Sequence, residues 1–234
     1  MEINQNYNLL IASTSTVYGS GYLEYILDEA VQFLNTDEIL FIPYARPSGV
    51  SFDEYTESPR KAFAAKGISV KGLHEFDNLQ EAILQAKAIF TGGGNTFLLL
   101  KSLYELDLID ALRVAVNSGT PYMGSSAGSN ITGLTIGTTN DMPIVYPPTF
   151  EALGFLPFNL NPHYLDPDLN SKHKGETRET RIKEFHQFNS QAVLGLREGS
   201  WLEVQNGKIL LKGDLTARLF QQGKEAVEIS EINF

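Results

Sequence analysis

The chain has 234 residues, 42% of them hydrophobic and 20% charged, a composition that is ordinary for a globular protein with its own core. It contains no cysteine, which excludes disulfides, thiolate nucleophiles and cysteine-bound zinc. Its net charge is −10 and its Lys and Arg residues are scattered, so the sequence does not indicate the basic face of a nucleic-acid-binding protein.

Apolar runs alternate with helical patterns through the first half of the chain. The strands are continuously apolar, which is typical of a mostly parallel sheet with helices on both faces. The fold class that this pattern predicts is α/β, with the ligand site at the carboxyl ends of the strands. We expect strands at 9–12, 39–43, 68–73, 88–91 and 121–124, and helices at 22–34, 52–66, 79–86 and 97–116, the last broken near Asp107.

Two hairpin signals follow near the C-terminus. Asn206-Gly207 separates the strand patterns at 201–205 and 208–212. Gln222-Gly223 separates two further strand patterns, at 217–221 and 226–229. We expect these antiparallel hairpins to form an edge of the same domain. No linker, repeat or low-complexity segment is visible, so the sequence predicts a single domain over 1–234.

The segment after the strand at 121–124 matches a nucleophile elbow. Gly124-Ser125-Ser126-Ala127-Gly128 fits the G-x-S-x-G pattern, in which a sharp strand-to-helix turn projects a serine hydroxyl into the cleft. The N–H of Ala127 would then face a developing oxyanion. The alternative is a glycine-rich turn whose serines cap a helix. Its place after an apolar strand favours Ser126 as a nucleophile.

A second glycine-rich loop, Gly92-Gly93-Gly94-Asn95-Thr96, follows the strand at 88–91. Its N–H groups could supply the second oxyanion donor. No Gly-Lys-Ser/Thr string follows and the G-x-G-x-x-G spacing is missing, so neither common nucleotide-binding loop is indicated. Glycine required only for tight packing is an equally good interpretation of this loop alone.

A serine nucleophile needs a general base and a group that orients that base. Of the four histidines, His163 is the best candidate because Pro162 restrains the backbone beside it. We expect His74 and His186 to be surface or partly packed side chains and His173 to be solvated. Asp141 is the candidate orienting group, with an Asx turn as the alternative. Glu198 is a second acidic candidate, with a solvated turn carboxylate as the alternative.

Metal binding is the rival interpretation of the stretch around His163. Asp166, Asp168 and His173 lie close to it in the sequence. Their spacing matches no known ligand pattern, so we favour the base role for His163 and expect no metal site.

Together these segments resemble the peptidase E family, the α-aspartyl dipeptidases. They occur in the family's order and cover most of the chain, and two of the strings are not general hydrolase features. The matching strings are Phe41-Ile42-Pro43, Gly92-Gly93-Gly94-Asn95-Thr96-Phe97, Ser126-Ala127-Gly128-x-Asn130, Thr138-Thr139-Asn140-Asp141-Met142-Pro143-Ile144-Val145, Asn161-Pro162-His163 and His173-Lys174-Gly175-Glu176-Thr177-Arg178-Glu179. One departure is Gly124-Ser125, where some members carry Gly-Trp.

The resemblance implies a fold like that of the class I glutamine amidotransferases, a flavodoxin-like arrangement, with serine in place of their cysteine. It implies hydrolysis of dipeptides with an N-terminal aspartate, without metal or cofactor. Carried over, the catalytic residues are Ser126, His163 and Asp141, with Glu198 as the other acidic candidate. Oxyanion donors would be Gly93 and Ala127, and the substrate-binding residues would be Arg178, facing the β-carboxylate, and Asn95.

Two other functions are compatible with parts of this pattern. A cyanophycinase-like enzyme, which cleaves β-aspartyl–arginine chains, shares Ser-Ala-Gly but is usually longer. A catalytically dead small-ligand binding protein on the same fold is the other, and the joint presence of Ser126, Asp141 and His163 argues against it.

The expected partner is a small peptide, with no nucleic acid and no membrane. No apolar run approaches the ~20 residues of a membrane span. The first residues lack the basic and apolar regions of a signal peptide. We therefore expect a cytoplasmic enzyme, of an oligomeric state that the sequence does not indicate.

Overall fold

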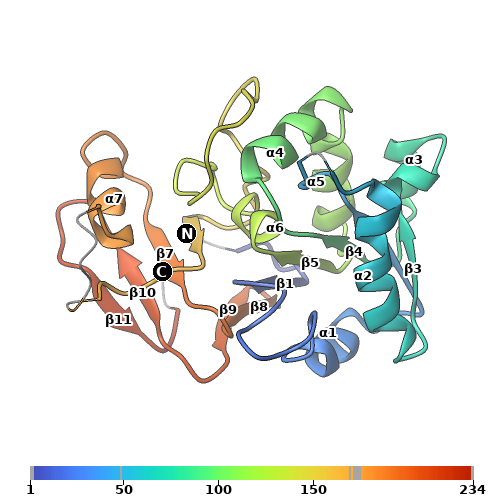
Figure 1. Ribbon diagram of the computed structural model, residues 1–234, viewed down its shortest axis with the longest axis horizontal. Coiled ribbons are helices and arrows are strands. Elements are labelled where there is room, and N and C mark those ends of the chain that lie inside the picture. Colours follow the sequence, from blue (N-terminus) through green and yellow to red (C-terminus); the bar gives the residue numbers. More distant parts are fainter. Residues whose placement is uncertain (1–2, 48, 169, 171–174, 233–234) are drawn as a thin grey trace.

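Five parallel strands form the centre of the larger sheet in the computed structural model, which describes residues 3–47, 49–168, 170 and 175–232 (Figure 1). The strand order is β3-β2-β4-β5-β1, and the antiparallel strands β8 and β9 continue the sheet beyond β1. Its strands are β1 (Leu9–Ala12), β2 (Glu38–Ile42), β3 (Ser69–Gly72), β4 (Ile89–Thr91), β5 (Tyr122–Ser125), β8 (Trp201–Gln205) and β9 (Lys208–Lys212).

Helices cover both faces of this sheet, as the continuously apolar strands predicted (Figure 1). Successive side chains of a strand point to opposite faces. In β1, Leu10 therefore joins the core beneath α1 and α2, whereas Leu9 and Ile11 join the core beneath α4 and α5. The helices are α1 (Leu27–Leu34), α2 (Phe52–Ala64), η1 (Leu73–Glu75), α3 (Leu79–Leu84), α4 (Thr96–Glu105), α5 (Ile109–Asn117), α6 (Ala127–Asn130) and α7 (Arg178–Phe185).

One helical pattern begins later than the sequence predicted, and another is interrupted where it was expected to be. The helical pattern at 22–34 yields a helix only from Leu27, because Leu23 has a left-handed backbone with φ of 58° and the chain turns there. The pattern at 97–116 is broken as expected, since Asp107 has φ of 53° between α4 and α5.

A second, four-stranded sheet with the order β11-β10-β7-β6 lies beside the first (Figure 1). Its strands are β6 (Asn159–Pro162), β7 (Val193–Leu196), β10 (Ala217–Phe220) and β11 (Val227–Ile229). The hairpin at 201–212 forms the expected antiparallel edge of the first sheet, but the second hairpin does not extend it. The chain leaves β9 at Gly213, which has φ of 90° and packs against the backbone of Gly199. This turn directs β10 back onto β7 instead.

The two sheets share packing and hydrogen bonds. Leu160, Leu194 and Leu196 of the second sheet lie in the same core cluster as Leu9 and Ile11 of the first. The loop between β7 and β8 is short, and β8 begins with Trp201, the single tryptophan of the chain. This arrangement places the carboxyl ends of β5 and β6 next to each other.

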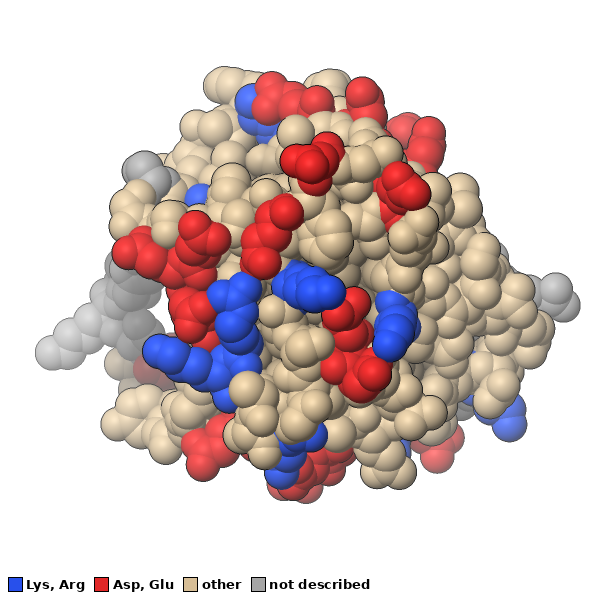
Figure 2. Space-filling model, turned by 90° about the vertical axis from the view of Figure 1, so that its right-hand side faces the viewer, with Lys and Arg blue, Asp and Glu red and all other residues tan. Residues whose placement is uncertain are grey.

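Figure 2 shows the side of the molecule on which α2, α3 and β3 lie. Lys and Arg side chains on this face are interspersed with Asp and Glu. Ion pairs between these elements include Arg60 with Glu75 and Lys71 with Glu38. Within the described ranges, no helix combines the length and the apolarity that crossing a membrane requires.

Candidate active site

Ser126 stands at the turn between β5 and α6, as the elbow pattern predicted. Its φ of 54° and ψ of −111° lie outside the regions that side-chain-bearing residues favour. A side chain at Gly124 would collide with the backbone of Gly128, and one at Gly128 would collide with the backbone of Thr91. The two glycines are therefore needed for the close backbone approach that holds the serine in this conformation.

His163 follows β6 and points at the serine. Its Nε2 lies 2.8 Å from Ser126 Oγ, within hydrogen-bonding distance. The backbone of His163 is also left-handed, with φ of 54°. Its N–H donates to Ser13 Oγ at 2.9 Å, and the Ser13 hydroxyl donates to the Leu196 carbonyl at 2.7 Å. The buried Ser13, at the end of β1, thus positions the histidine backbone.

Glu198 completes the line of hydrogen bonds. It lies in the loop between β7 and β8, and its Oε1 is 2.6 Å from His163 Nδ1. With the proton on Nδ1, the histidine donates to Glu198 and leaves Nε2 free to accept the Ser126 proton. The geometry is therefore that of a serine nucleophile, a histidine base and a carboxylate that orients the base.

Asp141, the acidic residue that the sequence favoured for orienting His163, takes a different position. Its Oδ2 accepts hydrogen bonds from the N–H and the hydroxyl of Thr96, both at 2.7 Å. The Nδ1 of His163 is already occupied by Glu198. Asp141 nevertheless lines the same pocket as Ser126 and His163. Asp141 is held at the N-terminus of α4, where its negative charge is favoured, and Glu198 is the carboxylate that contacts the histidine.

Backbone donors of two loops lie beside the nucleophile. A Cβ built on Gly93 would lie 3.0 Å from Ser126 Cβ, so this glycine backbone packs directly against the serine. The Gly93 carbonyl accepts a hydrogen bond from Tyr55 Oη at 2.8 Å, which fixes the orientation of the loop. Among the described residues, the N–H groups of Gly93 and Ala127 have no acceptor. Both are free to donate to a substrate oxygen.

Of the two residues assigned to substrate binding, Asn95 already uses its side chain in hydrogen bonds within the protein, whereas Arg178 does not use its charge in an ion pair within the described ranges. Asn95 caps α4: its Oδ1 accepts from the Leu98 N–H and its Nδ2 donates to the Met142 carbonyl. Its side chain therefore holds the loop together instead of facing the pocket. Arg178, the first residue of α7, is half-buried and forms no ion pair within the described ranges. Burial and the neighbouring Arg181 lower the pKa of its guanidinium, and the charge of Asp141 opposes that shift.

The other histidines lie outside this arrangement. His74 contacts Asp53 at 2.8 Å, and His186 is buried against the Gln191 carbonyl at 2.9 Å. His173 lies outside the described residues. In the part of the chain that is described, no three His, Asp or Glu side chains come together as metal ligands.

Sequence reasoning missed three residues of the site. Ser13 was hidden in a Ser-Thr run after a strand, and Thr96 was named only as the last residue of the glycine-rich loop. Asn130, one helical turn after Ser126, lines the pocket with a buried side chain. The signal that could have indicated it is its position four residues after the nucleophile, where the first turn of the helix brings its N–H to the Ser126 carbonyl at 2.8 Å.

The chain is similar to known peptidases over most of its length. The sequence profile of peptidase family S51 matches residues 9–212. The chain belongs to peptidase family S51. It is 47% identical over 229 residues to a Drosophila melanogaster protein named "Probable alpha-aspartyl dipeptidase", a match that covers 96% of this chain and 94% of that protein. It is 50% identical over 224 residues to peptidase E of Streptomyces coelicolor, covering 95% and 91%.

A solved structure of a peptidase from an acI-B1 Actinobacterium has a similar fold, with a TM-score of 0.68 at 16% identity. The match covers 95% of this chain and 97% of that one. Membership of family S51 makes the protein a peptidase, as the motifs predicted. The α/β fold with a large, mostly parallel sheet is confirmed as well.

Proposed function

We propose that the protein hydrolyses dipeptides with an N-terminal aspartate through an acyl-enzyme on Ser126. The observation that carries this proposal is the 2.8 Å contact between Ser126 Oγ and His163 Nε2, in a chain of family S51. The name of the Drosophila melanogaster relative supports the choice of substrate. The reaction needs neither metal nor cofactor, because the side chains supply nucleophile, base and acid.

The mechanism follows from the order of the hydrogen bonds. Ser126 Oγ attacks the peptide carbonyl carbon while His163 Nε2 takes the hydroxyl proton, and the carboxylate of Glu198 stabilises the imidazolium. The N–H groups of Gly93 and Ala127 donate to the oxyanion. His163 then gives the proton to the leaving amine, and water releases aspartate from the ester by the reverse sequence.

Recognition of the aspartyl side chain is assigned to Arg178. A guanidinium binds a carboxylate through two parallel hydrogen bonds. The absence of an ion-pair partner for Arg178 within the described ranges supports this role, because its charge is then available to a ligand. We include a cytoplasmic location in the proposal, since a chain without cysteine does not depend on an oxidising compartment.

Turnover of Asp-Leu by the wild type and by Ser126→Ala tests the central assignment. The wild type should release leucine, and the variant should lose on the order of 10⁶ in rate while keeping its melting temperature. Glu198→Gln should lower kcat for Asp-Leu by at least about tenfold, because a neutral amide cannot stabilise the imidazolium as the carboxylate does. Equal turnover in wild type and Ser126→Ala would contradict the proposal.

The same assay separates the other two functions. A cyanophycinase-like enzyme would cleave β-aspartyl-arginine in preference to Asp-Leu, and a binding protein would cleave neither. EDTA should not inhibit the reaction. Inhibition that added zinc reverses would instead favour a metal-assisted hydrolysis.

A further inference from the structure

The pocket beside Ser126 contains two hydrogen-bond acceptors for which the catalytic mechanism has no use. They are the carboxylate of Asp141 and the side-chain carbonyl of Asn130, and both residues line the pocket together with Ser126 and His163. Acceptors without donors, in a pocket next to a nucleophile, indicate a ligand group that donates hydrogen bonds.

The carboxylate of Asp141 is held in place through only one of its two oxygens, Oδ2. Its Oδ2 accepts two bonds from Thr96 and lies 3.2 Å from the Thr139 hydroxyl. Its Oδ1 has no donor among the described residues. The carboxylate is therefore fixed in place while one of its oxygens stays available.

Asn130 is 1% exposed, and its amide orientation is fixed by a 2.9 Å bond from Nδ2 to the Leu160 carbonyl. Its Oδ1 is buried and has no donor within the described part of the chain. A buried carbonyl without a donor costs about 1–3 kcal/mol, so such a group in a native structure calls for an explanation. A substrate group that donates to it supplies one.

We propose that Asp141 and Asn130 form the binding site for the α-ammonium group of the substrate's first residue. This inference rests on the proposed function and extends it. The α-ammonium is attached to the carbon next to the carbonyl that Ser126 attacks, so its site must adjoin the nucleophile. The pocket has a volume of about 20 Å³, enough for one group the size of a water molecule. An acylated amine carries no charge and is too large.

The site then recognises an aspartyl residue by both of its charges. The negative charge of Asp141 raises the pKa of the Arg178 guanidinium, against the lowering by burial and Arg181. The cation would bind the β-carboxylate and the anion would bind the α-ammonium. Because the ammonium is present only on the first residue of a peptide, the pocket restricts cleavage to the first peptide bond.

The test compares Asp-Leu with succinyl-leucine, which is the same molecule without the α-amino group. The wild type should prefer Asp-Leu in kcat/KM by about 30-fold or more, the range expected for losing one partner of a buried charged hydrogen bond. Asp141→Asn, which keeps the side-chain shape, should lose most of that preference and leave succinyl-leucine within a few-fold of its wild-type value. Asp77→Asn, at an exposed position between η1 and α3 that does not line the pocket, is the matched control for loss of one charge and should keep the preference.

Two outcomes overturn the inference: no preference in the wild type, or an equal loss for both substrates in Asp141→Asn, which would indicate a purely structural role. A binding experiment gives a readout that does not depend on turnover. In calorimetry, the wild type should bind L-aspartate more tightly than succinate. Asp141→Asn should bind the two ligands with similar affinity. If Asp-Leu is not hydrolysed, the proposed function fails, but the comparison of L-aspartate with succinate still tests the ammonium site. If Asp141→Asn also binds L-aspartate more tightly than succinate, the ammonium site is contradicted.

Discussion

Ser126 and His163, the two residues between which a proton would move, both have positive φ angles. Such conformations cost on the order of 1–3 kcal/mol each for residues with a side chain. They persist because neighbours hold them: the close-packed glycines around Ser126 and the hydrogen bond from the His163 N–H to Ser13. The backbone therefore sets the distance between nucleophile and base before any substrate binds.

Arg178 supports a prediction about specificity. Arg178→Ala should lower kcat/KM for Asp-Leu by about two decades or more, because truncating one partner of a buried charge pair leaves the other unpaired. The preference for Asp-Leu over Asn-Leu should fall with it, and Arg178→Lys should rescue only part of the loss since a point charge cannot replace the planar fork. Steady-state kinetics with the two dipeptides measure both effects.

Arg60→Ala is the control for that experiment. Arg60 lies on α2 and pairs with Glu57 and Glu75 at the surface, where an ion pair contributes only ~0–1 kcal/mol. This variant should keep the wild-type ratio of Asp-Leu to Asn-Leu. A wild-type ratio in Arg178→Ala would remove the specificity role from Arg178 even if Ser126 proves to be the nucleophile.

At the residue scale, short-range signals were sufficient for part of the site. The elbow motif selected Ser126 and a proline beside a histidine selected His163, and the structure brings these two side chains into contact. The choice between Asp141 and Glu198 depends on how the second sheet packs against the first, which no local pattern encodes. The motif string that contains Asp141 indicated that the residue belongs to the site, but not which group it faces.

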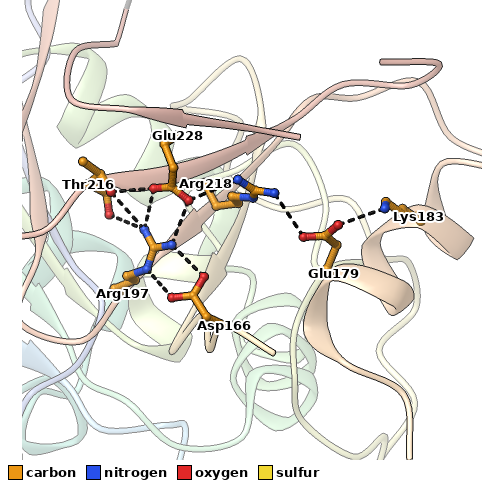
Figure 3. A network of polar contacts seen from close by, with 7 residues as sticks. All are labelled: Asp166, Glu179, Lys183, Arg197, Thr216, Arg218 and Glu228. Carbon is orange, nitrogen blue, oxygen red and sulfur yellow. Dashed lines mark hydrogen bonds and ion pairs between the residues drawn. The ribbon is translucent and has the colours of Figure 1, made fainter. Parts of the chain in front are cut away.

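Among the elements, a chain of ion pairs joins α7 to the second sheet (Figure 3). Arg197, adjacent to Glu198, forms two hydrogen bonds to Asp166 and two to Glu228 of β11. Arg218 of β10 extends the chain from Glu228 to Glu179 of α7. The network ties the loop after His163, the residue before Glu198 and the helix that begins with Arg178 into one unit.

This network predicts a dependence of stability on pH. Hydrogen bonds from Arg197, assisted by Thr216, lower the pKa of Glu228 to about 2. A carboxylate whose pKa is lower in the folded protein adds stability above its ordinary pKa of 4.5, and that stability is lost as pH falls toward 2. Glu228→Gln should therefore destabilise the protein by about 1 kcal/mol at pH 7, a value reduced by solvent screening of a side chain that is 42% exposed.

Urea unfolding at several pH values checks this expectation. The difference between wild type and Glu228→Gln should shrink steadily between pH 5 and pH 2. Glu231→Gln serves as the control, because Glu231 is exposed and has no ion-pair partner in the described part of the chain. A difference between wild type and Glu228→Gln that is independent of pH would mean that shape, not charge, makes the contribution.

The sequence predicted the strands best where they are buried and therefore consist of continuous apolar runs. Strands β1 to β5 and the hairpin of β8 and β9 were located from apolar runs and an Asn-Gly turn. Strand β6 was missed because Asn159, Asn161 and Pro162 interrupt its apolar pattern. Its asparagines are buried and bonded to polar groups of the loop that follows α6, so tertiary contacts compensate for their polarity.

For the molecule as a whole, the active site draws on both sheets. Ser126 and Ser13 follow strands of the first sheet, whereas His163 follows a strand of the second and Glu198 lies in the loop between them. One hydrophobic cluster contains residues of both. We therefore propose that the chain is a single domain despite its two sheets.

A single domain should unfold in one cooperative step. Unfolding in urea followed by far-ultraviolet circular dichroism should show one transition, with peptidase activity lost over the same range of concentrations. The reason is that Ser13 links β1 to β7 and to His163, so the second sheet cannot separate without breaking the first core. Two resolved steps, with activity lost in the first, would divide the chain into two units.

The position of Trp201 has a practical consequence. It is the only tryptophan, it follows Glu198 by three residues, and its ring lies against Tyr25, with 6.3 Å between ring centroids. Tyr25 in turn donates a hydrogen bond to the carbonyl of Thr14, next to Ser13. Fluorescence excited selectively at the indole therefore reports from one position, the start of β8 after the loop that carries Glu198. Intrinsic fluorescence offers an unlabelled optical signal for ligand occupancy at the neighbouring active site, without substitution or dye.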